Sequence, residues 1–248
     1  MLTHSPKIVL SGLSFAVDPA NVKSYSGSGN TMYDQASTTG RTVTLMDTQP
    51  TFSTTQVEGL GSLTFDGITG RGHISNNAAH PRIAWTPNGT VGNSGITFDF
   101  WVKTSDAIGN IISQPWNGSG DYNFYIQPTF FQVGANTNSQ ISFATTMATG
   151  AWMHGSCWAN STTMGYNING NQYTSSKAHL ITGDTPPTTV DLNPGIVLMS
   201  LYPYNSGWGG VTSQAVAGTM GPIKIYNRML SQDEILTNFN ALRGRYGL

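Results

Sequence analysis

The sequence predicts an all-β protein: a two-sheet antiparallel β-sandwich of jelly-roll type with a short, capped C-terminal helix. Three observations predict this fold. Short blocks of alternating apolar and polar residues recur along the chain, and Gly, Pro and Asn separate these blocks. No helical periodicity of useful length occurs before residue 231. Roughly a dozen short strands in a single domain, residues 1–248, favour two sheets packed face to face.

The first part of the chain contains one clear strand and a long segment without strong periodicity. Leu13, Phe15 and Val17 alternate with polar or small residues, so they are expected on one face of a strand. The segment from about 20 to 60 is rich in Ser, Thr, Gly and Gln. We expect it to wrap the sandwich as loops and edge strands. Residues 1–7 are interpreted as an N-terminal arm that orders only against a neighbour.

The next strands alternate more strictly. Leu63 and Phe65 lead into a turn at Asp66-Gly67. In the block GITFDFWVK, Trp101 points to one face, and four apolar side chains share the other: Ile96, Phe98, Phe100 and Val102. Strands are then expected in DYNFYIQ, FFQVGA and QISFATT.

The second half of the chain continues the pattern. In GAWMHGSCWAN, four side chains share one face of a strand: Trp152, His154, Ser156 and Trp158. Asn169-Gly170 is the strongest short hairpin signal in the chain. GIVLMSL and AGTMGPIKIYN supply the last strands.

The closing helix is predicted over residues 231–243. Ser231 and Glu234 are spaced as a capping box, and Leu230 and Ile235 occupy the two hydrophobic staple positions around it. Gly244 is placed to end the helix. Apolar residues fall on one stripe of the helix, namely Ile235, Phe239 and Leu242, so we expect it to lie on the sandwich, over one open end of the core.

The composition excludes several classes of function. Charged residues make up 9% of the chain, against about a quarter in an ordinary soluble domain, and the net charge is -1. This balance gives no basic surface for nucleic acid. The apolar run near the start is too short to span a membrane. The single cysteine, Cys157, excludes an intrachain disulfide and any metal cluster made of cysteines.

The sequence offers no catalytic constellation. Glycoside hydrolysis needs two carboxyl groups facing each other across a cleft, and no closely spaced acidic cluster is present. His154 and Cys157 lie three apart on a strand and so point to opposite faces, which favours a core thiol and a partly buried histidine over a nucleophile pair. We therefore expect a protein that is not an enzyme, with no catalytic residue.

No cofactor is assigned, and the other histidines show no spacing suited to zinc. Calcium binding is kept as an alternative, because carboxylates in loops are suitable calcium ligands. The candidates are Asp18, Asp34, Asp66 and Asp191, whose simpler interpretation is side-chain capping of turns.

Two Gly-rich segments combine aromatic rings with amide and carboxylate groups, the combination that binds sugars. Their candidate glycan-binding residues are Trp116, Asn117, Asp121 and Tyr122 in the first, and Tyr202, Tyr204, Asn205 and Trp208 in the second. The alternative is that these aromatics cap the core of the sandwich.

A family resemblance follows from several blocks in order: GSLTFDG, ITFDFWVK, GAWMHGSCW, MGYNINGNQ and the closing IKIYNR with MLSQDEI. Together they resemble laminin-G-like, concanavalin A-like jelly-roll domains. The opening THSPKIVLSGLSFAVDPANVKSYSGSGNTMYDQAS and the ending NFNALRGRYGL resemble structural proteins of tailed phages, marine ones included, that carry this domain.

The phage resemblance implies a virion structural protein. We expect a decoration or appendage module on the outer surface of capsid or tail, acting by contact with other virion proteins and assembled as a homo-oligomer or symmetric array. The alternative from a different class is a host-recognition lectin that binds surface polysaccharide through the two aromatic segments. A glycoside hydrolase is the third and least favoured reading.

Overall fold

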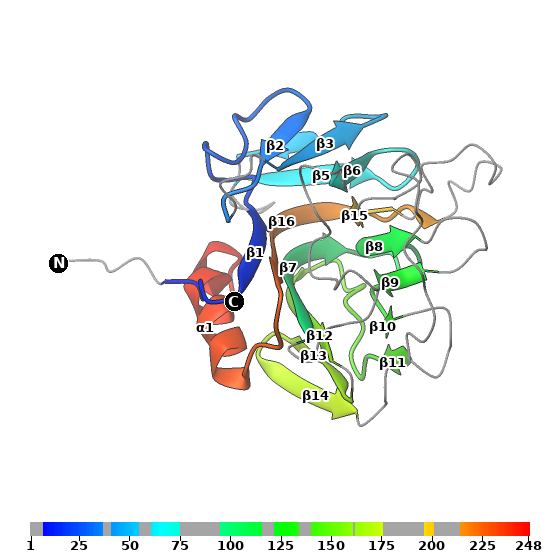
Figure 1. Ribbon diagram of the computed structural model, residues 1–248. Helices are drawn as coiled ribbons and strands as arrows, with labels where there is room; N and C mark the ends of the chain where they lie inside the picture. Colours follow the sequence, from blue (N-terminus) through cyan, green and yellow to red (C-terminus); the bar gives the residue numbers. More distant parts are fainter. Residues whose placement is uncertain are drawn as a thin grey trace, which may run out of the picture.

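The computed structural model describes residues 7–36, 41–54, 61–74, 95–115, 122–133, 140–160, 162–175, 196–200 and 214–248. Within these residues the chain forms two antiparallel sheets of eight strands each and a single α-helix near the C-terminus. The sheets pack face to face as a sandwich, and the helix lies outside them (Figure 1). The predicted fold class is therefore confirmed.

Sheet A has the order β14-β13-β12-β7-β16-β5-β4, and β1 also pairs with β16. Its central strands β7 and β16 come from distant parts of the chain and run side by side. The strands of sheet A are β1 (Leu13–Val17), β4 (Thr51–Ser53), β5 (Ser62–Asp66), β7 (Ile96–Thr104), β12 (Trp152–Ala159), β13 (Met164–Ile168), β14 (Asn171–Ser175) and β16 (Ala217–Tyr226).

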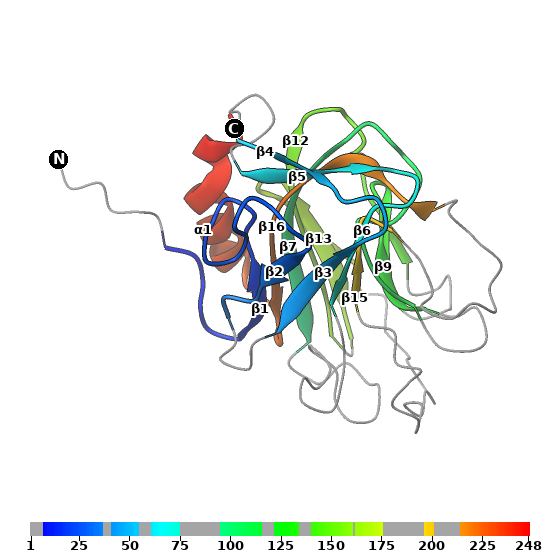
Figure 2. The ribbon, with the colours of Figure 1, turned by 90° about the horizontal axis from the view of Figure 1, so that it is seen from above.

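Sheet B has the order β11-β10-β9-β8-β15-β6-β3-β2 and forms the second layer, seen from another direction in Figure 2. Its strands are β2 (Thr31–Tyr33), β3 (Thr42–Met46), β6 (Arg71–Ile74), β8 (Ile112–Pro115), β9 (Tyr122–Ile126), β10 (Phe130–Val133), β11 (Gln140–Ser142) and β15 (Ile196–Leu198). The segment from 20 to 60 contributes β2 and β4, which are edge strands of the two sheets, as predicted. It also contributes β3, which lies inside sheet B between β2 and β6, so the prediction of edge strands alone is wrong there.

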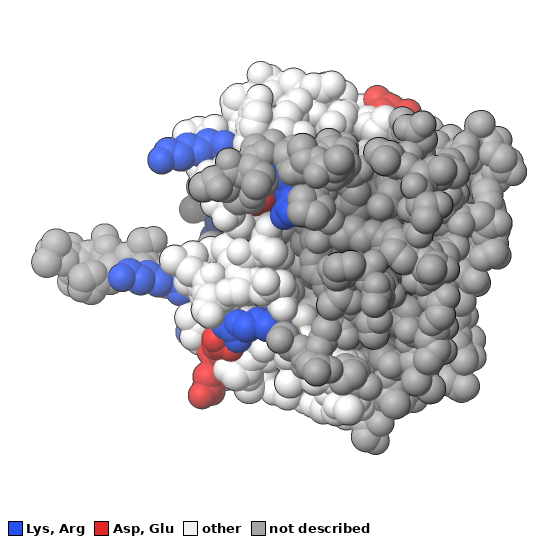
Figure 3. Space-filling model, in the orientation of Figure 1, with Lys and Arg blue, Asp and Glu red and all other residues white. Residues whose placement is uncertain are grey.

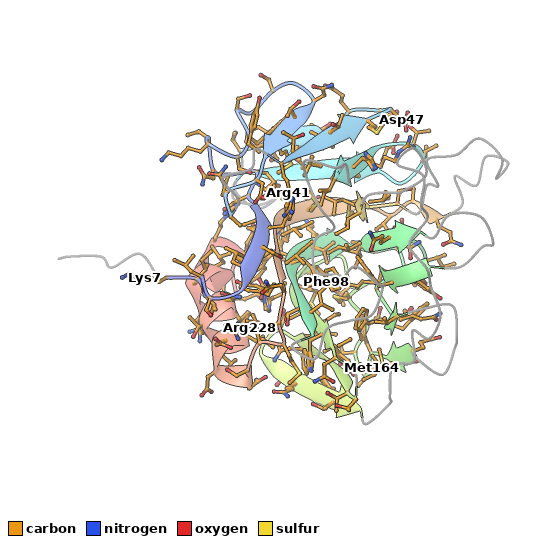
Figure 4. All side chains as sticks on the ribbon, in the orientation of Figure 1. Lys7, Arg41, Asp47, Phe98, Met164 and Arg228 are labelled. Atoms are coloured by element: carbon orange, nitrogen blue, oxygen red, sulfur yellow. The ribbon has the colours of Figure 1, made fainter. Side chains whose placement is uncertain are left out.

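The core fills the space between the two sheets. The four residues predicted to share a face of β7 all belong to this core, and Phe98 packs on Phe124 of sheet B with ring centroids 4.4 Å apart. Figure 4 shows Phe98 between the two layers. Cys157 also faces the core, where burial raises the pKa of its thiol. Trp101 points to the opposite face of sheet A, as the alternation predicted.

The predicted hairpin turn at Asn169-Gly170 is confirmed, but the predicted position of Leu13 is wrong. Asn169 and Gly170, with φ of 50° and 89°, form the two-residue turn between β13 and β14. On β1, a register shift between Leu13 and Phe15 moves Leu13 out of the main core, while Phe15 and Val17 stay in it. The predicted common face of these three residues is therefore wrong, because alternation assumes a strand without a bulge.

Helix α1 (Gln232–Leu242) begins with the predicted capping box. Ser231 accepts a hydrogen bond from the Glu234 N–H at 3.3 Å, and Glu234 accepts one from the Ser231 N–H at 2.9 Å. The end of the helix differs from the prediction, because Gly244 lies within a following 3₁₀ turn (Arg243–Arg245). Gly247, with φ of 75°, is the glycine with a left-handed backbone in this segment.

The helix lies against the outer face of sheet A, beside β1 (Figure 1). Phe239 stacks on Trp101 with centroids 5.9 Å apart, and Tyr246 stacks on the same indole at 4.3 Å. The predicted position over an open end of the core is thus wrong. The outer face of sheet A carries large aromatic side chains, and the helix removes them from water.

The capping box makes a first prediction. Ser231→Ala removes the hydrogen bond to the first turn and should lower the free energy of unfolding by about 1 kcal/mol in denaturant titrations. Thr237→Ala, on an exposed position of the same helix, should change it by less than about 0.5 kcal/mol. Equal effects of the two substitutions would contradict the role of the cap.

The stabilisation that Glu234 gives to the start of the helix should depend on pH. Its bidentate hydrogen bonds to Arg228, at 2.6 and 2.8 Å, lower the pKa of Glu234 to about 2. A depressed carboxyl pKa stabilises the folded state above the ordinary pKa and loses this effect as the pH falls from about 4.5 towards about 2. The melting temperature of Glu234→Gln should therefore lie below that of the wild type at pH 7, and the difference should shrink at low pH. A difference independent of pH would exclude this ion pair as the cause.

Candidate functional site

A buried carboxylate stands at the centre of the interface between sheet A and the helix. Asp99 on β7 accepts a hydrogen bond from Lys224 Nζ on β16 at 2.7 Å, and its second oxygen lies 3.0 Å from His154 Nε2 on β12. Asn238 of the helix donates to the same second oxygen at 3.2 Å. All four side chains are buried. Asp99 thus joins three strands and the helix at one point.

The charge of Asp99 is compensated locally. Burial by itself would raise the pKa of Asp99, but Lys224 and His154 outweigh it and hold the pKa below its ordinary value. Tyr226 lies beside this group, and burial with the nearby Asp99 charge raises its pKa. Asn238 completes the connection by donating to Tyr226 Oη at 3.0 Å and accepting from the Val9 N–H at 2.9 Å.

The Asp99 cluster differs from an ordinary active site because its side chains are closed off from solvent. Asp99 and His154 have no exposed surface, because the helix and the segment around Val9 cover them. The expectation of a partly buried His154 is therefore corrected to a fully buried one, whose Nε2 lies 3.0 Å from the carboxylate of Asp99. The predicted opposition of His154 and Cys157 across the sheet is correct. The cluster joins sheet A to the helix, and its four side chains are buried.

Removing the central charge should be costly. Asp99→Asn leaves Lys224 buried without its counter-ion, and it should lower the free energy of unfolding by about 3–5 kcal/mol. Asp233→Asn, in the exposed first turn of the helix, should cost less than about 1 kcal/mol. Denaturant titration of both variants measures the difference. A cost below 1 kcal/mol for Asp99→Asn would contradict the central position of this ion pair.

The outer face of sheet B has a different chemistry. A single row crosses all eight strands at matching register, and the alternate positions on these strands face the core. The row runs Thr31, Thr44, His73, Val197, Ser113, Tyr125, Gln132 and Gln140. Its members are hydroxyl, amide, imidazole and phenol side chains with one valine, and none carries a formal charge at neutral pH when the histidine is neutral. We call it the polar row.

Contacts within the polar row fix its polar groups. Tyr125 Oη donates to Gln132 Oε1 at 2.7 Å, and the Tyr125 ring meets Phe130 edge to face with centroids 5.4 Å apart. Burial and the neighbouring Arg71 lower the pKa of His73, which favours the neutral form of this imidazole. Uncharged donors and acceptors beside an aromatic ring suit a hydroxyl-rich ligand.

Most of the predicted glycan-binding residues lie outside the described residues. These are Trp116, Asn117, Asp121, Tyr202, Tyr204, Asn205 and Trp208. Tyr122 is the first residue of β9, where its backbone pairs with Pro115. The prediction for the eight side chains therefore stays a prediction.

The described residues that flank the two aromatic segments do lie together. The first segment follows β8 directly and leads into β9, its neighbour in sheet B. The second follows Ser200, whose carbonyl accepts a hydrogen bond from Ser113 Oγ of β8 at 2.8 Å. Ser113 belongs to the polar row. Both segments thus begin beside the same part of the outer face of sheet B.

The carboxylates proposed for calcium have protein partners. Asp18 forms a bidentate ion pair with Arg245 at 2.8 Å, and Asp66 accepts the N–H groups of three turn residues, from Ile68 to Gly70. The predicted turn at Asp66 is therefore present. Asp34 accepts the Ala16 and Ala36 N–H groups, and Asp191 lies outside the described residues. Within the part of the chain described, no three His, Cys, Asp or Glu side chains gather as metal ligands.

The surface is poor in charge. On the face shown in Figure 3, few of the described residues are Lys, Arg, Asp or Glu. Several of these charges are paired: Arg228 with Glu234, Arg245 with Asp18, and Arg71 with Asp47. Among the described helices, none has the length and apolar character needed to cross a membrane.

Comparison with known proteins supports the fold independently. The model of the family "Concanavalin A-like lectin/glucanases superfamily" matches residues 77–236, well over half of the chain. A search of curated proteins gave no match.

Among solved structures, the chain is similar to the binding domain of botulinum neurotoxin DC in complex with SialylT. The identity is 16% and the TM-score 0.60, with 94% of this chain and 52% of the other covered. For the same domain in complex with rat synaptotagmin II, the identity is 16% and the TM-score 0.60, with 93% of this chain and 52% of the other covered. For a sialidase of Trypanosoma rangeli in complex with sialic acid, the identity is 12% and the TM-score 0.61, with 94% of this chain and 33% of the other covered. The chain thus spans about half or less of these proteins, and the likeness concerns the fold.

Proposed function

We propose, from the premise that this chain belongs to the concanavalin A-like lectin/glucanases superfamily, that it is a glycan-binding module without catalytic activity. Its ligand would be an uncharged polysaccharide bound along the outer face of sheet B. The single observation that carries the proposal is the polar row, which places uncharged hydrogen-bonding groups in register across the sheet.

The partly exposed members of the row are the ones placed to touch a ligand. Thr31, Thr44, His73, Tyr125 and Gln140 retain exposed surface, whereas Val197, Ser113 and Gln132 on the same face are buried. Strands in a sheet lie about 4.8 Å apart, so the part from Ser113 to Gln140 spans roughly 14 Å. That length suits a short run of sugar units. A neutral row favours uncharged sugars, because no described cation of the row is available to pair with an acidic group.

The two aromatic segments are connected to residues of the same face. In sequence, residues 116–121 follow the end of β8, and residues 201–213 follow Ser200, whose carbonyl Ser113 binds. Under this proposal Trp116 and Trp208 stack on sugar rings while Asn117 and Asn205 bond their hydroxyls. Relatives in fold are described in complex with SialylT and with sialic acid, which supports glycan binding as a class. The identity of the sugar is a separate question.

An array of host-envelope glycans, neutral and acidic, tests this function on the full chain with and without calcium. Trp208→Ala and Gln140→Ala should each weaken binding to a neutral glycan about tenfold or more, with the melting temperature nearly unchanged. Gln172→Ala, exposed on β14 of sheet A, is the matched control and should bind like the wild type. Absence of binding to every glycan, or equal loss in the Gln172 control, would contradict the proposal.

A second function is proposed for the whole protein: a structural module on the outer surface of a tailed-phage particle, repeated by symmetry and in contact with other virion proteins. One observation favours it. The opening and ending that resemble phage proteins pack together, through Asp18 with Arg245 and Val9 with Asn238. The segment at Val9 and the closing helix form one layer over sheet A, next to β1, so these parts of the opening and the ending are neighbours in the molecule.

Both functions are compatible, since a module exposed on a particle can also bind host polysaccharide. Mass spectrometry of purified virions from the source of the sequence separates them. The chain should be present in many copies per particle if it decorates a capsid or tail. Its absence from purified particles would exclude the virion location and leave glycan binding to be judged on the array.

A further inference from the structure

Three groups able to form a covalent cross-link meet beneath the helix. Lys224 on β16 supplies an amine, Asn238 on α1 supplies a carboxamide, and Asp99 on β7 binds both of them. Lys224 Nζ lies 2.7 Å from one carboxylate oxygen, and Asn238 Nδ2 lies 3.2 Å from the other. A buried ion pair needs only the lysine and the aspartate. Here the same carboxylate also holds a carboxamide from a different element beside the amine.

The surroundings of Asn238 suit attack at its carboxamide carbon. The side-chain oxygen accepts the Val9 N–H at 2.9 Å, and this donor would stabilise negative charge that develops on the oxygen. The side-chain nitrogen also donates to Tyr226 Oη at 3.0 Å. Asp99, Asn238 and Tyr226 have no exposed surface, and Lys224 is 3% exposed. Water is therefore kept away from the groups that react.

We propose that Lys224 and Asn238 become joined by a spontaneous isopeptide bond, with Asp99 carrying the proton. Nζ of Lys224 attacks Cγ of Asn238, so the Nζ–Cγ bond forms and the Cγ–Nδ2 bond breaks. Because Nζ starts as an ammonium, Asp99 first accepts one proton from it and so makes it a neutral nucleophile. After the attack Asp99 passes this proton to Nδ2, which leaves as ammonia, and then carries the second Nζ proton to the ammonia to give ammonium. Overall, the lysine ammonium and the carboxamide give a secondary amide and an ammonium ion, so atoms and charge balance without any oxidant or cofactor.

The bond would attach the helix permanently to the sheet that it covers. Asn238 holds the segment at Val9, and Tyr226 donates to the Val9 carbonyl at 3.1 Å. The cross-link therefore fixes one member of the layer formed by the two ends of the chain. This inference is independent of glycan binding, because it concerns the opposite sheet.

The intact mass of the full-length chain, measured after denaturation, tests the proposal. The mass should be lower than the sequence mass by one ammonia molecule, either in freshly purified protein or after long incubation at neutral pH. Trypsin should then fail to cleave after Lys224. A branched peptide should contain Met229–Arg243 joined to the peptide that includes Lys224.

Variants identify the participating groups. Lys224→Arg and Asn238→Ala should each restore the full sequence mass, and Asp99→Asn should prevent or greatly slow the reaction. Asn238→Asp should instead lose one water molecule, since a carboxyl group replaces the carboxamide. An unchanged mass of the wild type after incubation would overturn the proposal. So would a loss of ammonia that maps to an Asn-Gly site such as Asn169-Gly170, where succinimide formation gives the same mass change.

Discussion

The ion pair of Asp99 with Lys224 determines how the rest of the molecule is layered. An ionised carboxylate in the centre of a sheet is tolerated only when partners surround it, and here they come from β16, β12 and the helix. The aromatic residues around it, Trp101 among them, are apolar surface that must be covered. The helix and the segment at Val9 satisfy both requirements together. The central strands of sheet A, β7, β12 and β16, are consequently buried on both of their faces along most of their length.

Under the proposed function, the ligand meets the outer face of sheet B. The outer face of sheet B presents uncharged polar groups in one register, and both aromatic segments begin beside it at β8. The two faces would then have separate roles: the covered face of sheet A holds the helix to the sheet, and the outer face of sheet B binds the ligand. The low charge content of the chain agrees with both roles. The charges near the layer over sheet A form ion pairs, and the polar groups on the outer face of sheet B are uncharged hydroxyl and amide groups.

Much of the fold was predictable because its signals are local. The alternation in β7, the Asn169-Gly170 turn and the box of Ser231 with Glu234 each depend on neighbours in sequence. The Asp99 cluster was missed, since Asp99 and Lys224 lie 125 positions apart. A signal existed: Asp99 alternates with core phenylalanines and precedes Trp101, which indicates a strand covered on both sides. The polar row could not be predicted from the sequence, because it depends on the register between strands that are not consecutive in the chain. The helix position failed for the same reason.

Hydrogen exchange of the full chain, with and without a saturating neutral envelope polysaccharide, tests the division between the two faces most directly. If the polar row binds the ligand, backbone amides in β8, β9 and β10 should gain protection. Those in β12, β13 and α1, which the layer over sheet A already protects, should not change. Protection that appears on the helix and on β12, with β8 to β10 unchanged, would contradict it. In that case the ligand would bind at the layer over sheet A, and the polar row would have only a structural role.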